Sequence, residues 1–242
     1  MTNLYTPINE LKPVGEDIWI VDGEVISFYG APYTTRMTII RLENGDLFCH
    51  SPIALTKDLK EQVEILGKVK HLVSPNWIHY AYIPEWAKAF EDTVAWASPK
   101  VRERAKEYKV DVSFDHDLQD GAEPIWEKEI DQLIAKGSKA HQEVVFFHKK
   151  SKTLILTDLI ENFESKKIPF WFRILGKFAG ILYPDGKTPI DMRFTFSGNH
   201  KELRKAVEQM ISWKPEKIII AHGKWFEKDA IAELKRAFRW CM

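Results

Sequence analysis

The sequence lacks the features that would assign it at once to several large classes of protein. Its two cysteines, Cys49 and Cys241, are too few for a disulfide framework, and no CxxC pair is present for a zinc ribbon. No stretch holds 18 uninterrupted apolar residues, and the first residues lack the basic and apolar regions of a signal peptide. We therefore expect a cytoplasmic protein with no membrane span.

An excess of one charge and the common nucleotide-binding motifs are also missing. Lysine plus arginine and aspartate plus glutamate each number 35, so the net charge gives no global reason to expect a nucleic acid partner. The motifs GxGxxG, the P-loop and GxSxG do not occur. We expect a small-molecule substrate or ligand as partner, and the oligomeric state stays open.

The composition and the order of patterns nevertheless predict a fold. At 242 residues and 45% hydrophobic content the chain can bury a sizeable core. No repeat or low-complexity linker divides it, so we predict a single domain over residues 1–242. The beginning predicts an antiparallel meander, with turns at Asp22-Gly23 and at Glu43-Asn44-Gly45. Helix and strand patterns alternate afterwards, which predicts an α/β fold of two packed sheets with helices outside, an αββα sandwich.

Several helix starts carry recognisable capping signals. Thr56 is placed to cap a helix over residues 57–66, and Gly67 is placed to end it. Ser98-Pro99 is typical of a helix start, with a cap followed by proline at the first position. Asn199 is placed to cap a helix over residues 201–213, whose apolar residues follow the helical period.

Three apolar strand patterns each run into a residue that can bind a metal ion. Ligands of open α/β sheets bind beyond the carboxyl ends of the strands, where such residues meet. The patterns are residues 153–157 followed by Asp158, residues 70–75 followed by Asn76 and His79, and residues 217–221 followed by His222. Two imidazoles and one carboxylate, with open positions, form a ligand set that suits Zn²⁺ or Fe²⁺.

The same stretches resemble the metallo-β-lactamase fold. The chain is more narrowly similar to an uncharacterised branch of that superfamily, classed only as a domain of unknown function. TLILTD at 153–158 looks like the strand and bridging aspartate of the superfamily, and IIIAHG at 218–223 looks like its last ligand element. Further matching pieces are RMTIIRL (36–42), HSPIAL (50–55), PNWIHY (75–80) and EVVFFHKKSKTLILTDL (143–159).

The chain departs from that superfamily at its signature motif. The pattern HxHxDH would place ligands at positions 75, 77, 79 and 80, where this sequence has Pro75, Trp77, His79 and Tyr80. Proline and tryptophan do not bind metals, so a site of two ions about 3.5–4 Å apart is poorly supported. The resemblance therefore implies a reduced site for one divalent ion, held by His79, Asp158 and His222.

Two interpretations of function follow from this reduced site. The first is a metal-dependent hydrolase of an ester, thioester, amide or phosphoester, in which Tyr80 or His50 assists by hydrogen bonding. The second is a non-catalytic member of the fold that binds a small ligand or a protein. In the second interpretation the three candidate ligands form a hydrogen-bonded polar cluster.

Each candidate residue also has an ordinary structural interpretation. Asp158 is placed to cap a helix beginning at Leu159, and Asn76 to form an Asx turn after the strand. His222 is a polar residue before a glycine turn, and His79 is compatible with a packed surface histidine. His141 lies near the place of the superfamily's middle ligand, although its surroundings match poorly.

The aromatic segment of residues 168–183 carries separate hypotheses. It contains five aromatic residues, and its only charges are Arg173 and Lys177. It is too short to span a bilayer easily, so we favour a lid or pocket wall, then a dimer contact, and last a membrane-surface helix. The first hypothesis makes Trp171, Phe172 and Phe178 substrate-binding residues and predicts a substrate with a hydrophobic portion.

Overall fold

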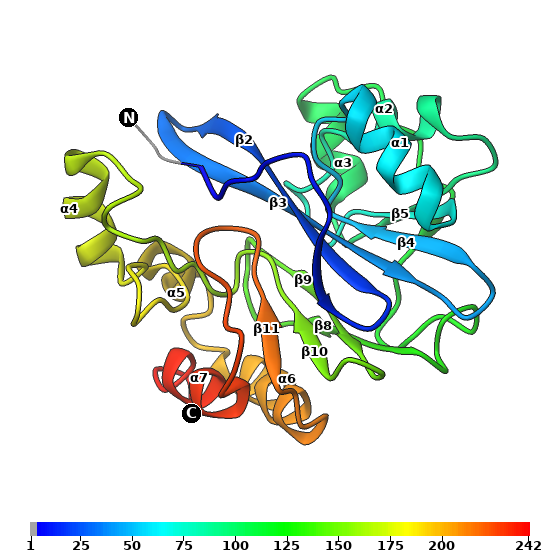
Figure 1. Cartoon of the computed structure of the whole chain (residues 1–242). Coiled ribbons are helices and arrows are strands. Elements are labelled where there is room, and N and C mark those ends of the chain that lie inside the picture. Colours follow the sequence, from blue (N-terminus) through cyan, green and yellow to red (C-terminus); the bar gives the residue numbers. More distant parts are fainter. Residues whose placement is uncertain (1–3) are drawn as a thin grey trace.

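Two sheets stack face to face in the computed structural model, which describes residues 4–242 (Figure 1). The larger sheet has seven strands in the order β1 to β7, and the smaller has four in the order β11-β10-β9-β8. The larger sheet comprises β1 (Lys12–Gly15), β2 (Ile18–Phe28), β3 (Ala31–Arg41), β4 (Asp46–His50), β5 (Lys68–Val73), β6 (Val94–Ala97) and β7 (His116–Asp117). The smaller comprises β8 (Ile130–Ala135), β9 (Glu143–His148), β10 (Thr153–Ile155) and β11 (Lys217–Ile219).

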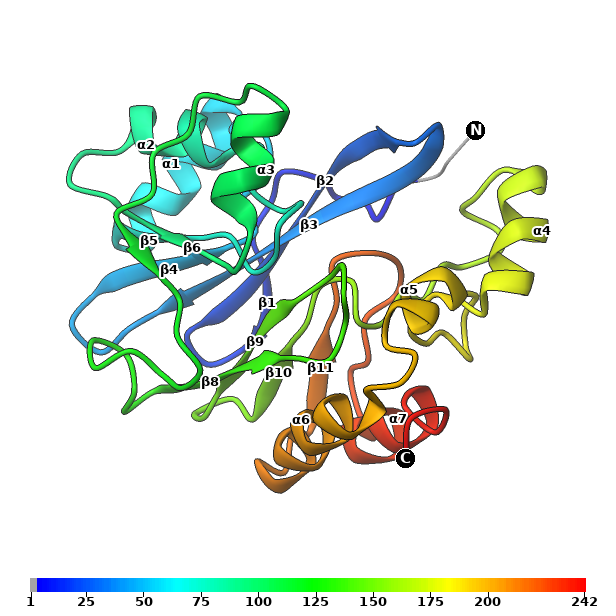
Figure 2. The same ribbon diagram turned by 180° about the vertical axis from the view of Figure 1, so that it is seen from behind.

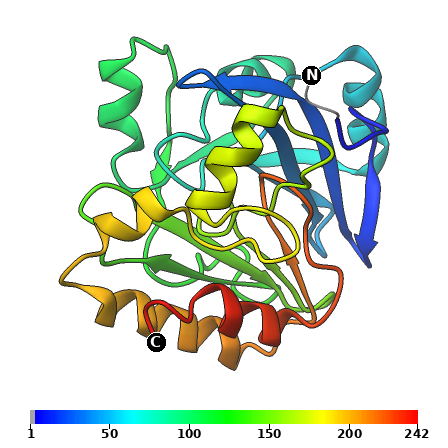
Figure 3. The same ribbon diagram turned by 90° about the vertical axis from the view of Figure 1, so that its left-hand side faces the viewer.

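Helices cover the outer faces of both sheets (Figures 1 and 2). The outer face of the larger sheet carries α1 (Lys57–Leu66), α2 (Ile83–Ala89) and α3 (Val101–Glu107), and that of the smaller carries α6 (His200–Ser212) and α7 (Ala230–Ala237). The remaining helices, α4 (Phe170–Ala179) and α5 (Ile190–Thr195), lie across one end of the sandwich (Figure 3). The predicted αββα architecture is confirmed.

The alternation of side chains along the strands explains why the sheets stack. Ile39 of β3 packs among the helices of the larger sheet, while its neighbour Ile40 packs into the core between the sheets. That inner core joins Phe48 of β4 to Phe146 of β9, whose ring centroids lie 5.2 Å apart. Because both faces of each sheet are covered, β4 is buried from Leu47 to His50 and β9 is buried along its whole length.

One of the two predicted hairpin turns is wrong. The chain does turn at Glu43-Asn44-Gly45, between β3 and β4, but β2 continues through Asp22-Gly23 to Phe28. The register of β2 against β3 shifts between Asp22 and Val25, so the expected turn is a bulge within a long strand. Asp22 is buried there beside Arg36 of β3, and this ion pair between distant residues overrides the local turn signal.

Of the three capping predictions, one is confirmed in full, one is confirmed in position alone and one is wrong. Thr56 accepts a hydrogen bond from the Leu59 N–H at the start of α1, and the helix ends at Gly67 as expected. At α3, however, the capping position is Lys100 with φ 68°, two residues after Ser98, and its side chain makes no capping bond. Asn199 is the capping residue of α6, as expected, but its side chain makes no capping bond.

Strand direction determines where functional side chains gather. Strands β4, β5 and β6 run parallel in the larger sheet, and β10 runs parallel to β11 in the smaller. The loops after β5, β10 and β11 lie together, as their shared contacts below show. Within residues 4–242, no helix is both long and apolar enough to cross a bilayer.

Candidate functional site

Three of the predicted residues meet at the end of the sandwich where the loops after β5, β10 and β11 lie together. His79 follows β5, Asp158 follows β10 and His222 follows β11. Asp158 Oδ1 lies 3.3 Å from His79 Nε2 and 3.1 Å from His222 Nε2. One ligand atom from each residue lies within 4.8 Å of the other two, as a shared metal ion requires. The structure therefore brings the three predicted residues together.

The spacing of these atoms fits the first coordination sphere of a small divalent ion. Tetrahedral ligands at metal distances of about 2.0–2.1 Å lie about 3.3 Å from one another. The two distances from Asp158 Oδ1 to the imidazole nitrogens are close to this value. Two histidines and one carboxylate leave a fourth position open, which is the arrangement of catalytic rather than structural zinc sites.

The surroundings of His222 fix which of its nitrogens faces the carboxylate. Its Nδ1 lies 2.8 Å from the Thr34 carbonyl oxygen, which can only accept, so Nδ1 carries the hydrogen. In the neutral ring Nε2 then presents a lone pair to Asp158 Oδ1, and two acceptors at 3.1 Å repel each other. The contact therefore requires a positive charge there, either a proton on Nε2 or a metal ion between the two atoms. A carbonyl behind a histidine is the usual outer contact of a metal ligand.

His79 is held in a similar way from its other side. Its Nδ1 lies 2.7 Å from Ser51 Oγ, and Ser51 follows β4 directly. Burial lowers the pKa of His79, but the Asp158 carboxylate raises it more, so the pKa lies above its usual value. Burial likewise raises the pKa of Asp158, but His79 and His222 hold it well below its usual value. The carboxylate is therefore ionised at neutral pH and available as a ligand.

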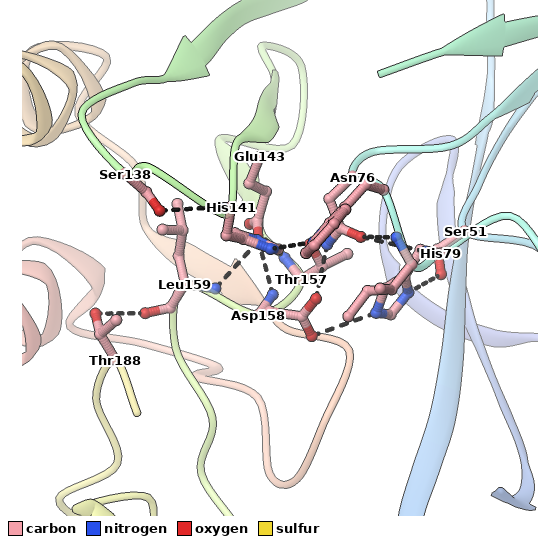
Figure 4. A network of polar contacts seen from close by, with 12 residues as sticks. Ser51, Asn76, His79, Ser138, His141, Glu143, Thr157, Asp158, Leu159 and Thr188 are labelled. Atoms are coloured by element: carbon pink, nitrogen blue, oxygen red, sulfur yellow. Dashed lines mark hydrogen bonds and ion pairs between the residues drawn. The ribbon is translucent and has the colours of Figure 1, made fainter. Parts of the chain in front are cut away.

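Asn76 combines the two roles that the sequence left open. Its Oδ1 accepts hydrogen bonds from the Ile78 and His79 N–H groups, which forms the expected turn. Its Nδ2 donates to Asp158 Oδ2 at 2.7 Å and thereby orients the carboxylate (Figure 4). The alternative in which Asp158 caps a helix from Leu159 is wrong, because no helix begins there.

Glu143 is a buried residue of the site that sequence analysis did not identify. It is the first residue of β9 and is fully buried. Its Oε1 accepts from the Thr157 N–H at 2.7 Å, and its Oε2 accepts from the Asp158 and Leu159 N–H groups (Figure 4). These bonds fix the backbone that carries Asp158. Charged groups at the start of a strand give no local signal, so only the folded structure shows this role.

His141 and Glu143 form a second group with Asp158 on the interior side of that residue. One ligand atom from each of the three lies within 4.8 Å of the others. His141 Nδ1 accepts a hydrogen bond from Trp77 Nε1 at 3.1 Å, and its Nε2 lies 3.6 Å from Glu143 Oε2. Trp77, at a position where the superfamily motif has a ligand, therefore supports a histidine through a hydrogen bond.

Arg36 is the second residue that sequence analysis missed. It is buried in β3, and its guanidinium lies against the Asp22 carboxylate, with Nε to Oδ1 at 2.8 Å. Its Nη1 donates to the carbonyl oxygens of Ile220 and Gly223 at 2.8 and 2.9 Å, on either side of His222. Gly223 has φ 95°, and a Cβ there would lie 2.2 Å from the Asn162 carbonyl oxygen. Arg36 thus ties the His222 turn to the opposite sheet.

The three candidate ligands line a cavity of about 460 Å³ beneath α4. This volume is within the usual range for sites that bind small molecules. Phe172, Phe178 and Tyr80 also line the cavity, whereas Trp171 and His50 are not among the lining residues. His50 is buried, and burial, together with nearby His79, lowers its pKa to about 3. Of the two residues suggested to assist a reaction, Tyr80 is therefore the one that lines the cavity.

Comparison with known proteins places the chain in a family. The profile described as "Domain of unknown function (DUF4336)" matches residues 15–174, more than half of the chain, so the chain belongs to this family. The matched range includes His79 and Asp158 and ends within α4, before His222. None of the curated proteins matches the sequence.

Solved structures identify the fold as that of the metallo-β-lactamases. The DIM-1 metallo-β-lactamase exposed to ceftazidime is 16% identical with a TM-score of 0.67, over 99% of this chain and 96% of that one. The mono-zinc form of FIM-1 from Pseudomonas aeruginosa is 8% identical with a TM-score of 0.62, over 98% and 96%. Rubredoxin oxygen:oxidoreductase from Desulfovibrio gigas is 13% identical with a TM-score of 0.63, over 96% and 61%. Because lactamases and an oxidoreductase share the fold, the fold alone does not select the reaction.

Proposed function

We propose that the protein is a metal-dependent hydrolase with a single divalent ion, zinc or iron, held by His79, Asp158 and His222. The observation that supports this most is the contact between His222 Nε2 and Asp158 Oδ1, which needs a positive charge between two acceptors. The open fourth position and the adjoining cavity favour a site for reaction over a purely structural one.

The chain's own residues prepare the site for this chemistry. A divalent ion bound there would lower the pKa of a bound water and polarise the bond to be cleaved. Ser51 and the Thr34 carbonyl orient the two imidazoles, while Asn76 and the Glu143-bound backbone orient Asp158. Tyr80, which is among the lining residues of the cavity, is the candidate for a hydrogen bond to the substrate oxygen.

The cavity wall suggests which part of a substrate the chain recognises. Phe172 is buried and Phe178 is exposed, and both line the cavity from α4. A substrate with an apolar portion would contact these two side chains and exclude water from the site. Trp171 lies outside the lining and contacts Phe172, with the two ring centroids 5.6 Å apart, so it would act by supporting that residue.

The alternative function is that of a non-catalytic binding module. Pro75 and Trp77 stand at two motif positions where ligands would be expected, and Trp77 serves a structural hydrogen bond instead. In that case His222 carries a proton on Nε2, and the three residues form an ion-paired cluster. The two functions differ in metal content.

Metal analysis of the purified protein tests the proposal. We expect about one zinc or iron ion per chain in the wild type, and its loss in Asp158→Ala and in His222→Ala. His116→Ala is the matched control, because it removes an exposed imidazole and should leave the metal in place. A chelator should also lower the melting temperature of the wild type, since a bound ion stabilises the folded state.

A metal-loaded protein would then be screened with esters, thioesters, amides and phosphoesters. Turnover in the wild type that is lost in His222→Ala supports the hydrolase. Wild-type protein that binds no zinc, iron or manganese, with a melting temperature unchanged by chelator, contradicts it and favours the binding module.

A further inference from the structure

Glu161 is a second acid in the cavity wall, and the candidate metal site gives it no role. The residue is only 5% exposed, yet it lines the cavity together with Asp158 and His222. Within residues 4–242, its Oε2 has no hydrogen-bond partner. Its backbone N–H donates to the Lys187 carbonyl at 3.3 Å, which fixes the segment in place.

Neither metal binding nor folding explains this carboxyl. Glu161 is not part of either group of side chains whose ligand atoms lie within 4.8 Å of one another. Burial, Asp158 and Asp191 raise its pKa well above the usual value, so the position is unfavourable for a carboxylate. A buried polar group without a partner destabilises the folded state. Such a group at a cavity wall is typical of a site whose partner is the ligand.

The cavity around Glu161 has one polar end and one apolar end. The polar end holds Glu161 and the three candidate metal ligands. The apolar side is formed mainly by the tip of the β2–β3 hairpin and by α4. Its lining residues include Ile26, Phe28, Phe172, Leu175 and Phe178. A ligand that fills this space therefore needs a polar head and an apolar tail.

We propose that Glu161 accepts a hydrogen bond from an N–H or hydroxyl group in the polar head of an amphipathic substrate, whose apolar chain lies along α4. The substrate class is then an acyl amide, or an ester with a neighbouring hydroxyl. A donor in the head stabilises the ionised form of Glu161, which a head that only accepts hydrogen bonds does not do. That the ligand is also a substrate rests on the hydrolase function proposed above. The preference of Glu161 for a head with a hydrogen-bond donor does not require turnover.

A pair of matched probes isolates the proposed hydrogen bond. Octanamide and N,N-dimethyloctanamide have the same chain and the same carbonyl group, and only the first has N–H donors. Calorimetric titration of the full chain, with zinc and again in chelator, should show at least about tenfold tighter binding of octanamide by the wild type. Glu161→Leu should bind the two amides equally, which also controls for the bulk of the methyl groups.

Two further variants distinguish a hydrogen bond from an effect of charge. Glu161→Gln keeps an oxygen acceptor and should keep most of the preference for octanamide. Asp191→Asn removes an exposed carboxyl of the same cavity wall and should keep the whole preference, because both probes are neutral. If Glu161 serves binding rather than folding, Glu161→Leu should also melt at a higher temperature than the wild type.

Several results would overturn the assignment of Glu161. They are equal affinity of the wild type for the two amides, absence of binding of either one, a preference that survives in Glu161→Leu, or a lower melting temperature of that variant. None of these results depends on metal content or turnover. A protein without metal that still prefers octanamide would refute the hydrolase and retain the role of Glu161.

Discussion

Asp158 lies between two groups of similar side chains that have different surroundings. On the cavity side are His79 and His222, here called the cavity pair, whose Nε2 atoms both face Asp158 Oδ1. On the interior side are His141 and Glu143, here called the interior pair. Each pair could complete a three-ligand group with Asp158, so residue types and distances do not separate them.

The difference lies in which atoms are already bound. In the interior pair both oxygens of Glu143 accept backbone N–H groups, so this carboxylate holds the protein together. In the cavity pair the outer nitrogens are fixed by Ser51 and Thr34, while the inner nitrogens converge beside a cavity. The two pairs therefore differ in what their side chains already hold: both Glu143 oxygens are occupied by backbone N–H groups, although His141 Nε2 has no partner, whereas the Nε2 atoms of the cavity pair contact Asp158 beside the cavity. The predictions below start from the largest expected effect on stability and end with the smallest.

Arg36→Met should have the largest effect on stability. The change leaves Asp22 buried with only Lys12 as an ionic partner and removes both hydrogen bonds to the His222 turn. We expect the free energy of unfolding, measured with urea, to fall by about 3–5 kcal/mol. Arg41→Met is the control: its pair with Asp17 is at the surface, so the expected loss is below about 1 kcal/mol. Similar losses in the two variants would show that Arg36 does not fasten the turn.

Glu143→Gln tests the interior pair. In the wild type both oxygens of the Glu143 carboxylate accept hydrogen bonds from backbone N–H groups. In the variant the amide nitrogen would replace one of these oxygens and face an N–H donor, so we expect a loss of about 1–3 kcal/mol in the free energy of unfolding. The metal content should remain that of the wild type. Glu127→Gln, an exposed control, should be within about 0.5 kcal/mol of the wild type. Loss of metal with unchanged stability would make Glu143 a ligand instead.

Ser51→Ala tests the cavity pair through its outer contact. The variant removes the hydroxyl that lies 2.7 Å from His79 Nδ1 and leaves all three ligands. We expect metal affinity, measured by competition with a chelating dye, to fall about tenfold, which is about 1.4 kcal/mol. The exposed Ser197→Ala should leave the affinity unchanged. An unchanged affinity in Ser51→Ala would mean that Ser51 does not orient the ligand.

Two buried histidines, His71 and His148, make the stability of the protein depend on pH. Burial lowers the pKa of His71 and of His148 to about 4, against about 6.5 in the unfolded chain. Between these values the unfolded state binds more protons, so the free energy of unfolding is highest above pH 6.5 and falls toward pH 4. From pH 7.5 to 5.5 we expect a loss of about 1 kcal/mol per histidine in urea titrations.

Replacing one of these histidines checks the origin of that loss. His148→Gln should lose less stability over this interval than the wild type, whereas the exposed His116→Gln should follow the wild-type profile. A variant profile as steep as that of the wild type would assign the pH dependence to other groups.

The sequence predicted the grouping of His79, Asp158 and His222 because each lies in the loop just after an apolar strand pattern, so local order carries the signal. It missed Glu143, Arg36 and Glu161, whose partners or roles come from segments far apart along the chain. The same limit explains the wrong hairpin at Asp22-Gly23. That dipeptide is a local turn signal, but Arg36 pairs with Asp22 across the strands, and β2 continues through the dipeptide with a bulge.

The most direct test of this account compares the metal content of His79→Ala with that of His141→Ala. Both variants remove one imidazole from a three-residue group that contains Asp158. We predict that His79→Ala loses the ion, while His141→Ala keeps about one ion per chain. The opposite result, or equal loss in both variants, would contradict the assignment of the metal to the cavity side of Asp158.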